Sequence, residues 1–238
     1  MTKLGINIDH VATLRNARGE AHPNLLHAAK VAMSSGANSI TIHLREDRRH
    51  VKDIDLKKIS KIKNIPLNLE IATNLKMLNI ALKNKPNFVC LVPEKRREIT
   101  TEGGLNLKKN FTKIKKIIKR LNSKKIRTSL FINPYLNDIK LSKKIGTNCI
   151  EIHTGNLSNL IKQKKRFKNE LQKINNCCSL AKKLNIEVHA GHGLDYKSCK
   201  VLSKNKIIKE FNIGHFIIGE SIFYSLTSVI KKFKKIIN

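Results

Sequence analysis

The sequence predicts a closed (β/α)8 barrel, formed by one domain that spans residues 1–238. Short runs rich in β-branched residues alternate with longer amphipathic stretches, which is the pattern of parallel β-α units. Eight such units follow one another without a linker or a break in composition, and 238 residues is a usual length for one barrel. An open doubly wound sheet is the alternative, but no GxGxxG motif follows the first strand, so its dinucleotide-binding form loses support.

The strands and helices can be placed in order along the chain. The predicted strands, each a short β-branched run, are residues 4–9, 39–44, 66–71, 88–92, 127–132, 149–154, 187–190 and 211–213. Between and after them, helix-like segments lie near residues 24–35, 53–62, 74–84, 106–121, 136–145, 157–184, 195–203 and 220–236. The segment 157–184 is longer than one covering helix needs, so an additional helix or a cover over part of the site is expected there.

The formal net charge of +31 raises the prospect of an anionic partner such as nucleic acid. Most of this charge is lysine on helix-like stretches such as residues 113–119, where isoleucines recur at helical spacing and lysines fill the outer face. Aromatic residues are only 5% of the chain, which leaves little for base stacking. We therefore interpret the charge as a solvated surface that attracts phosphorylated substrates, and expect no specific nucleic-acid partner.

Cysteine usage and hydropathy favour a cytoplasmic protein. The five cysteines form no CxxC pair and are odd in number, which argues against a disulfide framework and a cysteine-based zinc site. No apolar run is long enough to span a bilayer, and residues 1–7 lack the features of a secretory signal. The histidines at 189 and 192 do not lie on a helical HExxH face, so we expect no metal.

Polar side chains collect at the carboxyl ends of the predicted strands. In a barrel these ends surround one mouth, where reactive groups lie. Buried polar groups are costly when unpaired, so their shared placement indicates a site. They are Asn7, Asp9 and His10 at the first strand, His43, Arg45 and His50 around the second, Asn68 and Glu70 in the third, Glu151 and His153 in the sixth, His189 and His192 around the seventh, and His215 after the eighth.

Several of these residues also have a structural explanation. His43 fits a hydrogen-bonded core histidine, and Glu70 fits one half of an ion pair with Arg45. Glu151 fits a residue that orients a neighbour, and at least one arginine of the pair at 48–49 fits simple surface charge.

Glycine motifs after the last two strands predict phosphate binding. Residues 191–194 (GHGL) and 212–215 (NIGH) occupy the loops in which barrel enzymes often hold phosphates on backbone N–H groups. Glycine permits the close approach or positive φ that such a turn needs. Further donors are expected from residues 100–104, after the fourth strand, and from Arg18 with Gly19, after the first.

Seven blocks resemble motifs of the pyridoxine 5'-phosphate synthases. They are residues 5–19 (GINIDHVATLRNARG), 43–50 (HLREDRRH), 91–98 (LVPEKRRE), 100–104 (TTEGG), 151–155 (EIHTG), 190–194 (AGHGL) and 212–215 (NIGH). The blocks follow the family's order and span nearly the whole chain. Two positions depart from the family's pattern: His189, where a smaller polar residue such as Asn is expected, and Glu220, near which a basic residue is common.

The resemblance implies condensation of 3-amino-2-oxopropyl phosphate with 1-deoxy-D-xylulose 5-phosphate to pyridoxine 5'-phosphate, phosphate and water. It implies general acid/base roles for His43 and Glu70, a proton-donor role for His192 and a charge-stabilising role for Glu151. The residues implied to hold the amino-ketone phosphate are Asn7, Arg18, Gly193, Gly214 and His215. Those implied to hold the xylulose phosphate are Asp9, His10, Arg45, His50 and Thr100. It also implies a transferase that assembles as a homo-octamer and needs no lysine Schiff base, metal or organic cofactor.

Two other functions compete with this interpretation. A barrel aldolase or isomerase of sugar phosphates would share the phosphate loops but would act on one phosphorylated substrate alone. A basic nucleic-acid-binding protein would bind DNA or RNA tightly, with a steep dependence on salt. Neither accounts for the ordered blocks.

Overall fold

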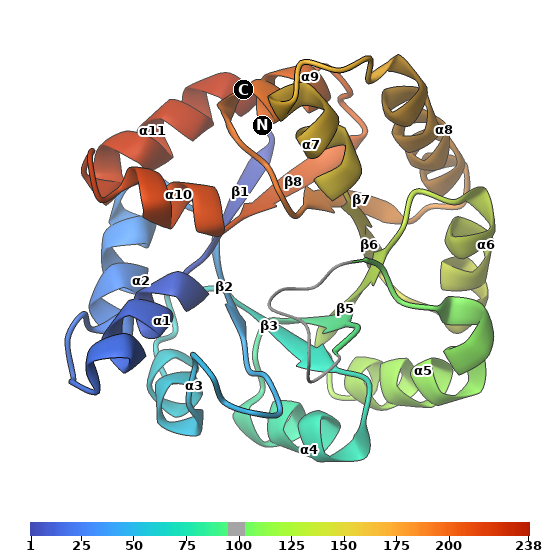
Figure 1. The fold of residues 1–238 in the computed structure, drawn as a ribbon. Helices are drawn as coiled ribbons and strands as arrows, with labels where there is room; N and C mark the ends of the chain where they lie inside the picture. The colour runs from blue at the N-terminus through green and yellow to red at the C-terminus, as the bar shows by residue number, and fades with distance from the viewer. Residues whose placement is uncertain (95–102) are drawn as a thin grey trace.

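The computed structural model of the protein describes residues 1–94 and 103–238. Its eight parallel strands close into a barrel in the order β1-β2-β3-β4-β5-β6-β7-β8, and helices surround it (Figure 1). The predicted (β/α)8 barrel is therefore confirmed. The strands are β1 (Lys3–Asn7), β2 (Ser39–His43), β3 (Leu67–Ala72), β4 (Phe88–Val92), β5 (Arg127–Ile132), β6 (Cys149–His153), β7 (Glu187–Gly191) and β8 (Ile208–Ile213).

The helices follow the strands along the chain. They are α1 (Asp9–Arg18), α2 (Leu25–Ser34), α3 (Asp53–Ile59), α4 (Leu75–Asn84), α5 (Leu107–Asn122), α6 (Leu136–Ile145), α7 (Gly155–Lys162), α8 (Lys168–Lys183), α9 (Tyr196–Leu202), α10 (His215–Glu220) and α11 (Leu226–Ile237). The last helix returns the chain to its beginning, where the backbone N–H of Thr2 donates to Oδ1 of Asn238 at 2.8 Å. The two termini consequently lie side by side (Figure 1).

Period-two patterning places apolar side chains outside the barrel and polar ones inside it. In β2, Ile40 and Ile42 belong to the hydrophobic core between strands and helices. Thr41, the residue between them, instead accepts a hydrogen bond from Asn68 of β3 at 3.2 Å. Successive side chains of a β-strand point to opposite faces of the sheet. Alternate residues of each strand therefore pack against the helices, and the residues between them point into the barrel interior. The interior is consequently rich in groups that can carry or exchange protons.

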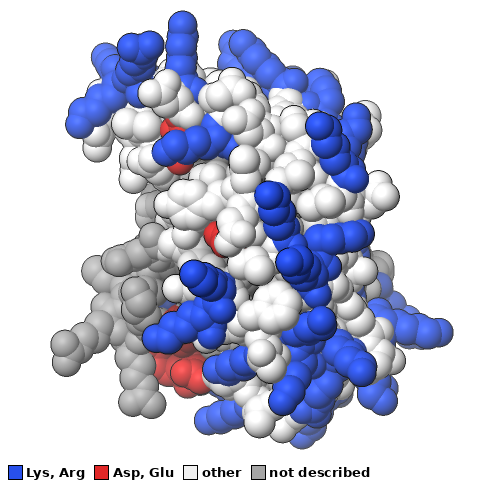
Figure 2. Space-filling view, turned by 90° about the vertical axis from the view of Figure 1, so that its right-hand side faces the viewer, with Lys and Arg blue, Asp and Glu red and all other residues white. Residues whose placement is uncertain are grey.

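The lysine-rich helices use one face for packing. In α5, Ile114, Ile117, Ile118 and Leu121 are buried, at the spacing that aligns side chains along one side of a helix. The lysines between them lie on the outside, as predicted for residues 113–119. Figure 2 shows many lysine and arginine side chains spread over one face of the molecule, with other residues and little acidic surface between them. Within the described part of the chain, none of the helices is both long and apolar enough to cross a membrane.

Several element boundaries differ from the sequence-based prediction, most of them by one or two residues, and four differences are larger. The first strand ends at Asn7 rather than at Asp9, because the chain turns there into α1, a helix that the patterning did not predict. The segment 157–184 contains two helices, α7 and α8, so the additional helix expected there is present. The predicted helix 220–236 corresponds to α11, which begins only at Leu226, and α10 is a further helix that the patterning did not predict. Finally, β8 begins at Ile208, three residues before the predicted start.

Candidate active site

One cavity of about 720 Å³ opens at the carboxyl ends of the strands. It brings together residues from β1, β2, β3, β4, β5, β6 and β8 and from the segments that follow β1, β2, β6, β7 and β8. Twelve of the fourteen predicted site residues line it: Asn7, Asp9, His10, His43, Arg45, His50, Glu70, Glu151, His192, Gly193, Gly214 and His215. The structure therefore brings these twelve residues together around one cavity at the mouth of the barrel.

The other two predicted residues are Arg18, which lies outside the cavity, and Thr100. The side chain of Arg18 is 78% exposed at the end of α1, and its Nη2 lies 3.9 Å from Oε1 of Glu20. Thr100 lies outside the described residues.

Asp9 joins the first two strands at the cavity wall. One carboxylate oxygen accepts the backbone N–H of His43 at 2.8 Å, and the other accepts Nδ2 of Asn7 at 2.9 Å. The side-chain oxygen of Asn7 in turn accepts the backbone N–H of Asp9 at 2.9 Å. These reciprocal bonds fix the turn from β1 into α1, and they hold the backbone of His43 in place.

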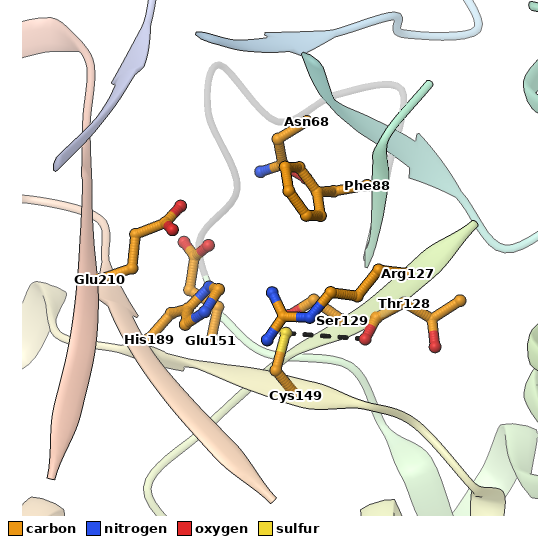
Figure 3. A pocket seen from close by; sticks show the side chains of 9 residues that line it. All are labelled: Asn68, Phe88, Arg127, Thr128, Ser129, Cys149, Glu151, His189 and Glu210. Carbon is orange, nitrogen blue, oxygen red and sulfur yellow. Dashed lines mark hydrogen bonds between the residues drawn. The ribbon is translucent and has the colours of Figure 1, made fainter. Parts of the chain in front are cut away.

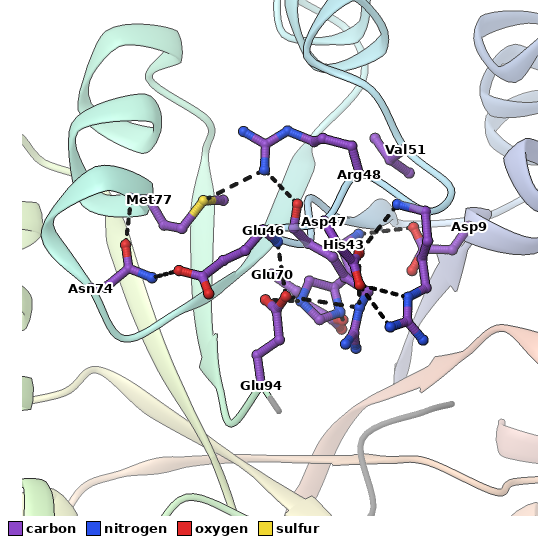
Figure 4. A network of polar contacts seen from close by, with 12 residues as sticks. Asp9, His43, Glu46, Asp47, Arg48, Val51, Glu70, Asn74, Met77 and Glu94 are labelled. Carbon is purple, nitrogen blue, oxygen red and sulfur yellow. Dashed lines mark hydrogen bonds and ion pairs between the residues drawn. The ribbon is translucent and has the colours of Figure 1, made fainter. Parts of the chain in front are cut away.

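His43 lies between two carboxyl groups (Figure 4). Its Nδ1 is 3.8 Å from Oε2 of Glu70, and its Nε2 is 3.6 Å from Oε2 of Glu94. The side chains of His43 and Glu94 are 6% and 3% exposed, so both are shielded from water. Glu94 has no role in the sequence-based assignment, although it directly follows the fourth strand within the block 91–98.

The two carboxyl groups beside His43 have opposite tendencies to hold a proton. Burial is the main cause that raises the pKa of Glu70 well above its ordinary value, and the charges of Glu151 and Asp9 raise it further. Burial also opposes ionisation of Glu94, but the His43 imidazole and the backbone N–H of Glu46 outweigh it and lower its pKa. An imidazole between a protonated and an ionised carboxyl can accept a proton on one side and return it on the other.

Glu151 occupies the floor of the cavity. Its Oε2 accepts Nδ2 of Asn212 at 2.8 Å, and burial is the main cause that raises its pKa to about 7. Two glycines make room for this pair. A Cβ at Gly191 would lie 2.0 Å from Oε1 of Glu151, and a Cβ at Gly5 would lie 2.1 Å from Oδ1 of Asn212.

Beneath Glu151, the barrel interior contains a second small cavity lined by charged side chains (Figure 3). His189 shares a 2.8 Å hydrogen bond between its Nε2 and Oε1 of Glu187, and the same oxygen pairs with Nη2 of Arg127 at 2.8 Å. The charge of His189 partly offsets the rise in the pKa of Glu151. His189, where a smaller polar residue was expected from the resemblance, therefore lies behind the cavity floor and lowers the pKa of Glu151.

Three histidines line the wall formed by β1, β8 and the loop after β2. The rings of His10 and His215 lie 4.9 Å apart, and those of His43 and His50 lie 6.0 Å apart. Burial lowers the pKa of both His10 and His50, so both tend to be neutral. Nδ1 of His50 accepts the backbone N–H of Val51 at 2.9 Å, which places the proton of the neutral ring on Nε2.

His192 lies in the loop after β7 and has a positive φ of 74°. Its ring stacks on that of His153 with centroids 4.8 Å apart, and Thr154 fixes the loop because its hydroxyl donates to the carbonyl of His192 at 2.8 Å. Burial and then the charge of Lys162 lower the pKa of His192. Burial and then His192 lower the pKa of His153 to about 4.

Arginines after β2 supply positive charge on one side of the cavity. Nε of Arg45 lies 3.5 Å from Oδ1 of Asp47 and 3.8 Å from Oε1 of Glu94, and Arg49 lines the cavity while it pairs with Asp47. Arg48 instead turns outward, where it binds Asp53 at 2.8 Å and the carbonyl of Arg45. Arg48 is therefore the arginine of the pair that fits surface charge.

Several lining residues were not assigned from the sequence. They are Thr13, Arg49, Val92, Phe131, Lys162, Leu194, Asn212, Ile213 and Phe216. Asn212 could have been found, because it lies in the NIGH block and alternates into the barrel. Lys162 is one lysine among many on a helix, so nothing in the local sequence distinguishes it. Among the residues that the structure describes, no cluster of three or more His, Cys, Asp or Glu side chains is arranged to hold a metal ion.

The fold resembles that of other barrel enzymes. Solved structures with TM-scores of 0.65 and 0.58 are a tryptophan synthase from M. tuberculosis and a phosphoribosylanthranilate isomerase from Thermotoga maritima. Both matches cover 100% of this chain, and they cover 93% and 98% of those chains respectively. Sequence identities are only 9% and 11%, so this likeness concerns the fold alone.

Sequence comparison gives a closer relationship. The family model of the pyridoxal phosphate biosynthesis protein PdxJ matches residues 4–238. The pyridoxine 5'-phosphate synthase of Pelagibacter ubique is 60% identical over 238 residues, which is 100% of both chains. That of Zymomonas mobilis is 49% identical over 232 residues, which is 98% of this chain and 90% of the relative. With this cavity in this barrel, the chain is an enzyme of pyridoxine biosynthesis and belongs to the PdxJ family.

Proposed function

We propose that the enzyme condenses 3-amino-2-oxopropyl phosphate with 1-deoxy-D-xylulose 5-phosphate to give pyridoxine 5'-phosphate, phosphate and water. The observation that carries this proposal is the cavity of about 720 Å³, which contains proton-transfer groups on its floor and cationic side chains on two sides. A single-substrate aldolase or isomerase needs only one phosphate anchor. A cavity with two separate cationic sides suits two phosphorylated substrates held next to each other.

The chemistry requires several proton transfers. The substrate amine attacks a ketone, water and phosphate leave, and a carbon nucleophile closes the ring. We assign proton transfer to His43 and Glu70, because His43 lies between Glu70 and the carboxylate of Glu94. The raised pKa of Glu70 supports this role, since burial makes this carboxyl hold its proton more tightly, as a general acid requires.

The remaining roles are those that the family resemblance implies, and the position of each group in the cavity is compatible with them. His192 and Glu151 lie on the β6–β7 side, where His192 donates a proton and Glu151 stabilises positive charge on intermediates. Gly193, Gly214 and His215 hold the amino-ketone phosphate near α10, while Arg45 and His50 hold the xylulose phosphate near β2. Holding both reactants in one pocket converts a bimolecular condensation into a positioned reaction.

A coupled product assay tests the proposal. Purified protein is mixed with both substrates in the presence of a chelator, and pyridoxine 5'-phosphate and phosphate are measured together. Equal amounts of both products, formed only when both substrates are present, are expected. Absence of product from folded protein, or turnover of one substrate alone, would overturn the proposal in favour of a single-substrate barrel enzyme.

Further properties belong to this proposal: the transferase class and the assembly rest on the family resemblance, and the location and the single domain rest on the sequence pattern. The enzyme is a transferase, it works in the cytoplasm, and it assembles as a homo-octamer from chains in which residues 1–238 act as one domain. Sedimentation of the purified enzyme tests the assembly.

A further inference from the structure

We propose that Lys162 is a ligand of the phosphate group bound at the β7–β8 side of the cavity. This residue lies outside the seven sequence blocks that carry the family resemblance. The inference rests on the proposed function, since it takes the phosphate there to be that of the amino ketone.

Lys162 is placed at this side of the cavity by its own helix. It is the last residue of α7, which follows β6 directly, and it lines the cavity together with His192, Gly193 and Gly214. Its Nζ donates to the carbonyl oxygen of Gly193 at 3.1 Å. An ammonium group carries three N–H donors, so it can keep this bond and still donate to a phosphate oxygen at the N–H groups of the loop.

Lys162 is the cation that the described structure places on this side of the cavity. Among the described residues that line the cavity, the lysines and arginines are Arg45, Arg49 and Lys162. The two arginines follow β2, and Lys162 follows β6, which is diametrically opposite in a barrel of eight strands. Arg18, the cation assigned here by resemblance, is 78% exposed outside the cavity. Lys162 is therefore the described cation that lies beside Gly193.

The charge of Lys162 also acts on His192, the proposed proton donor. His192 is packed against the ring of His153 and lies close to Lys162, and these are the titratable groups on β6 and α7 that the structure places against it. After burial, Lys162 is the cause that lowers the pKa of His192. A phosphate dianion bound to Lys162 offsets this positive charge, so binding of the phosphate favours protonation of His192. Occupancy of the subsite and loading of the proton donor are thus linked.

The steady-state test replaces Lys162 by Met, which keeps the length of the side chain and removes its charge. The matched control is Lys165→Met, three residues later, because Lys165 is exposed and does not line the cavity. We expect K162M to raise the KM for the amino-ketone phosphate about tenfold, the loss expected for one charge-assisted hydrogen bond that is partly exposed to water. The KM for the xylulose phosphate should stay within about twofold, as should both constants of the control. Equal KM values for K162M and K165M would overturn the proposal.

A binding experiment separates this proposal from the proposed function. Inorganic phosphate is titrated into the wild-type enzyme and both variants while the ring protons of His192 are followed by NMR. In the wild type and K165M, phosphate should raise the pKa of His192. In K162M the pKa of His192 should already be higher without phosphate. The phosphate concentration at the midpoint of the titration should be about tenfold higher than in the wild type. If the coupled assay gives no product while K162M alone shows the weaker phosphate response, the proposed function is wrong and Lys162 is still a phosphate ligand. Identical titration curves for all three proteins would overturn the proposal that Lys162 binds phosphate and would leave the proposed function unaffected.

Discussion

Replacement of Gly191 by Ala tests whether the position of Glu151 matters for catalysis. Gly191 faces the barrel interior and does not have a positive φ, so Ala fits the backbone without strain. Its Cβ, however, would lie 2.0 Å from Oε1 of Glu151, whereas ordinary contacts begin near 3.4 Å. The carboxylate must therefore move by about 1.4 Å, the difference between these two distances.

This displacement has two measurable consequences. The bond of 2.8 Å from Asn212 to Glu151 is distorted inside the barrel, and overpacking of this kind costs about 1–3 kcal/mol. For a chain of this size we expect a fall in Tm of roughly 2–12 °C by differential scanning fluorimetry. A misplacement of about 1 Å in a catalytic group can lower the rate about 100-fold, so kcat should fall by about that factor in the coupled product assay.

Two further variants make the test specific. Gly219→Ala is the matched control, because a Cβ at this position of α10 meets no atom within 4 Å, and we expect its kcat to be unchanged. Adding Glu151→Asp to Gly191→Ala shortens the acid and removes the clash, so the double variant should regain most of the lost Tm. A Gly191→Ala enzyme with the kcat and Tm of the wild type would refute the reasoning.

Three other predictions concern buried charges. Glu70→Gln should abolish most turnover and yet raise Tm, and the gain in Tm should grow above about pH 4.5. Because the pKa of Glu70 is raised in the folded enzyme, the folded wild type keeps a proton that the unfolded chain loses, so its stability falls as pH rises. A Tm difference independent of pH would contradict this. Arg15→Met should cost about 3–5 kcal/mol in urea unfolding, because Arg15 binds both oxygens of buried Asp55 at 2.6 and 2.9 Å. Adding Asp55→Asn should recover part of that loss, and no recovery would argue against an unpaired charge as the cause. His189→Asn should raise the pKa of Glu151 and move the corresponding limb of the kcat profile to higher pH, so an unmoved profile would exclude coupling between the two groups.

The barrel and most of the site could be predicted because both depend on local patterns. Alternating strands such as 39–44 carry their own register, and the carboxyl ends of parallel strands meet at one mouth whatever the sequence between them. The helix α1 could not be predicted in this way. Alternation of Ile6 and Ile8 continues past the end of β1, and the turn is stabilised by the bond from the backbone of His43 to Asp9, a residue 34 positions away.

Side-chain pairings across the barrel could not be predicted either, because they join residues that are far apart in the sequence. The local pattern suggested Arg45 as the partner of Glu70, whereas the structure places His43 Nδ1 3.8 Å from Glu70 and Glu94 on the other side of the imidazole. Which lysine reaches the cavity depends on where α7 ends relative to the loop after β7. Hydrophobic periodicity gives no information on the distance between these two segments. Contacts of this kind become visible only when the strands are in register.

The adjacent termini make the chain suitable for circular permutation. Thr2 and Asn238 are already hydrogen-bonded, so a short linker can join the two ends without moving either of them. The join lies where β1 begins, at the amino-terminal end of the barrel, whereas the cavity opens at the carboxyl ends of the strands. An affinity tag, a fused partner or a solid support attached at either terminus is therefore held on the side of the barrel away from the path by which substrates enter.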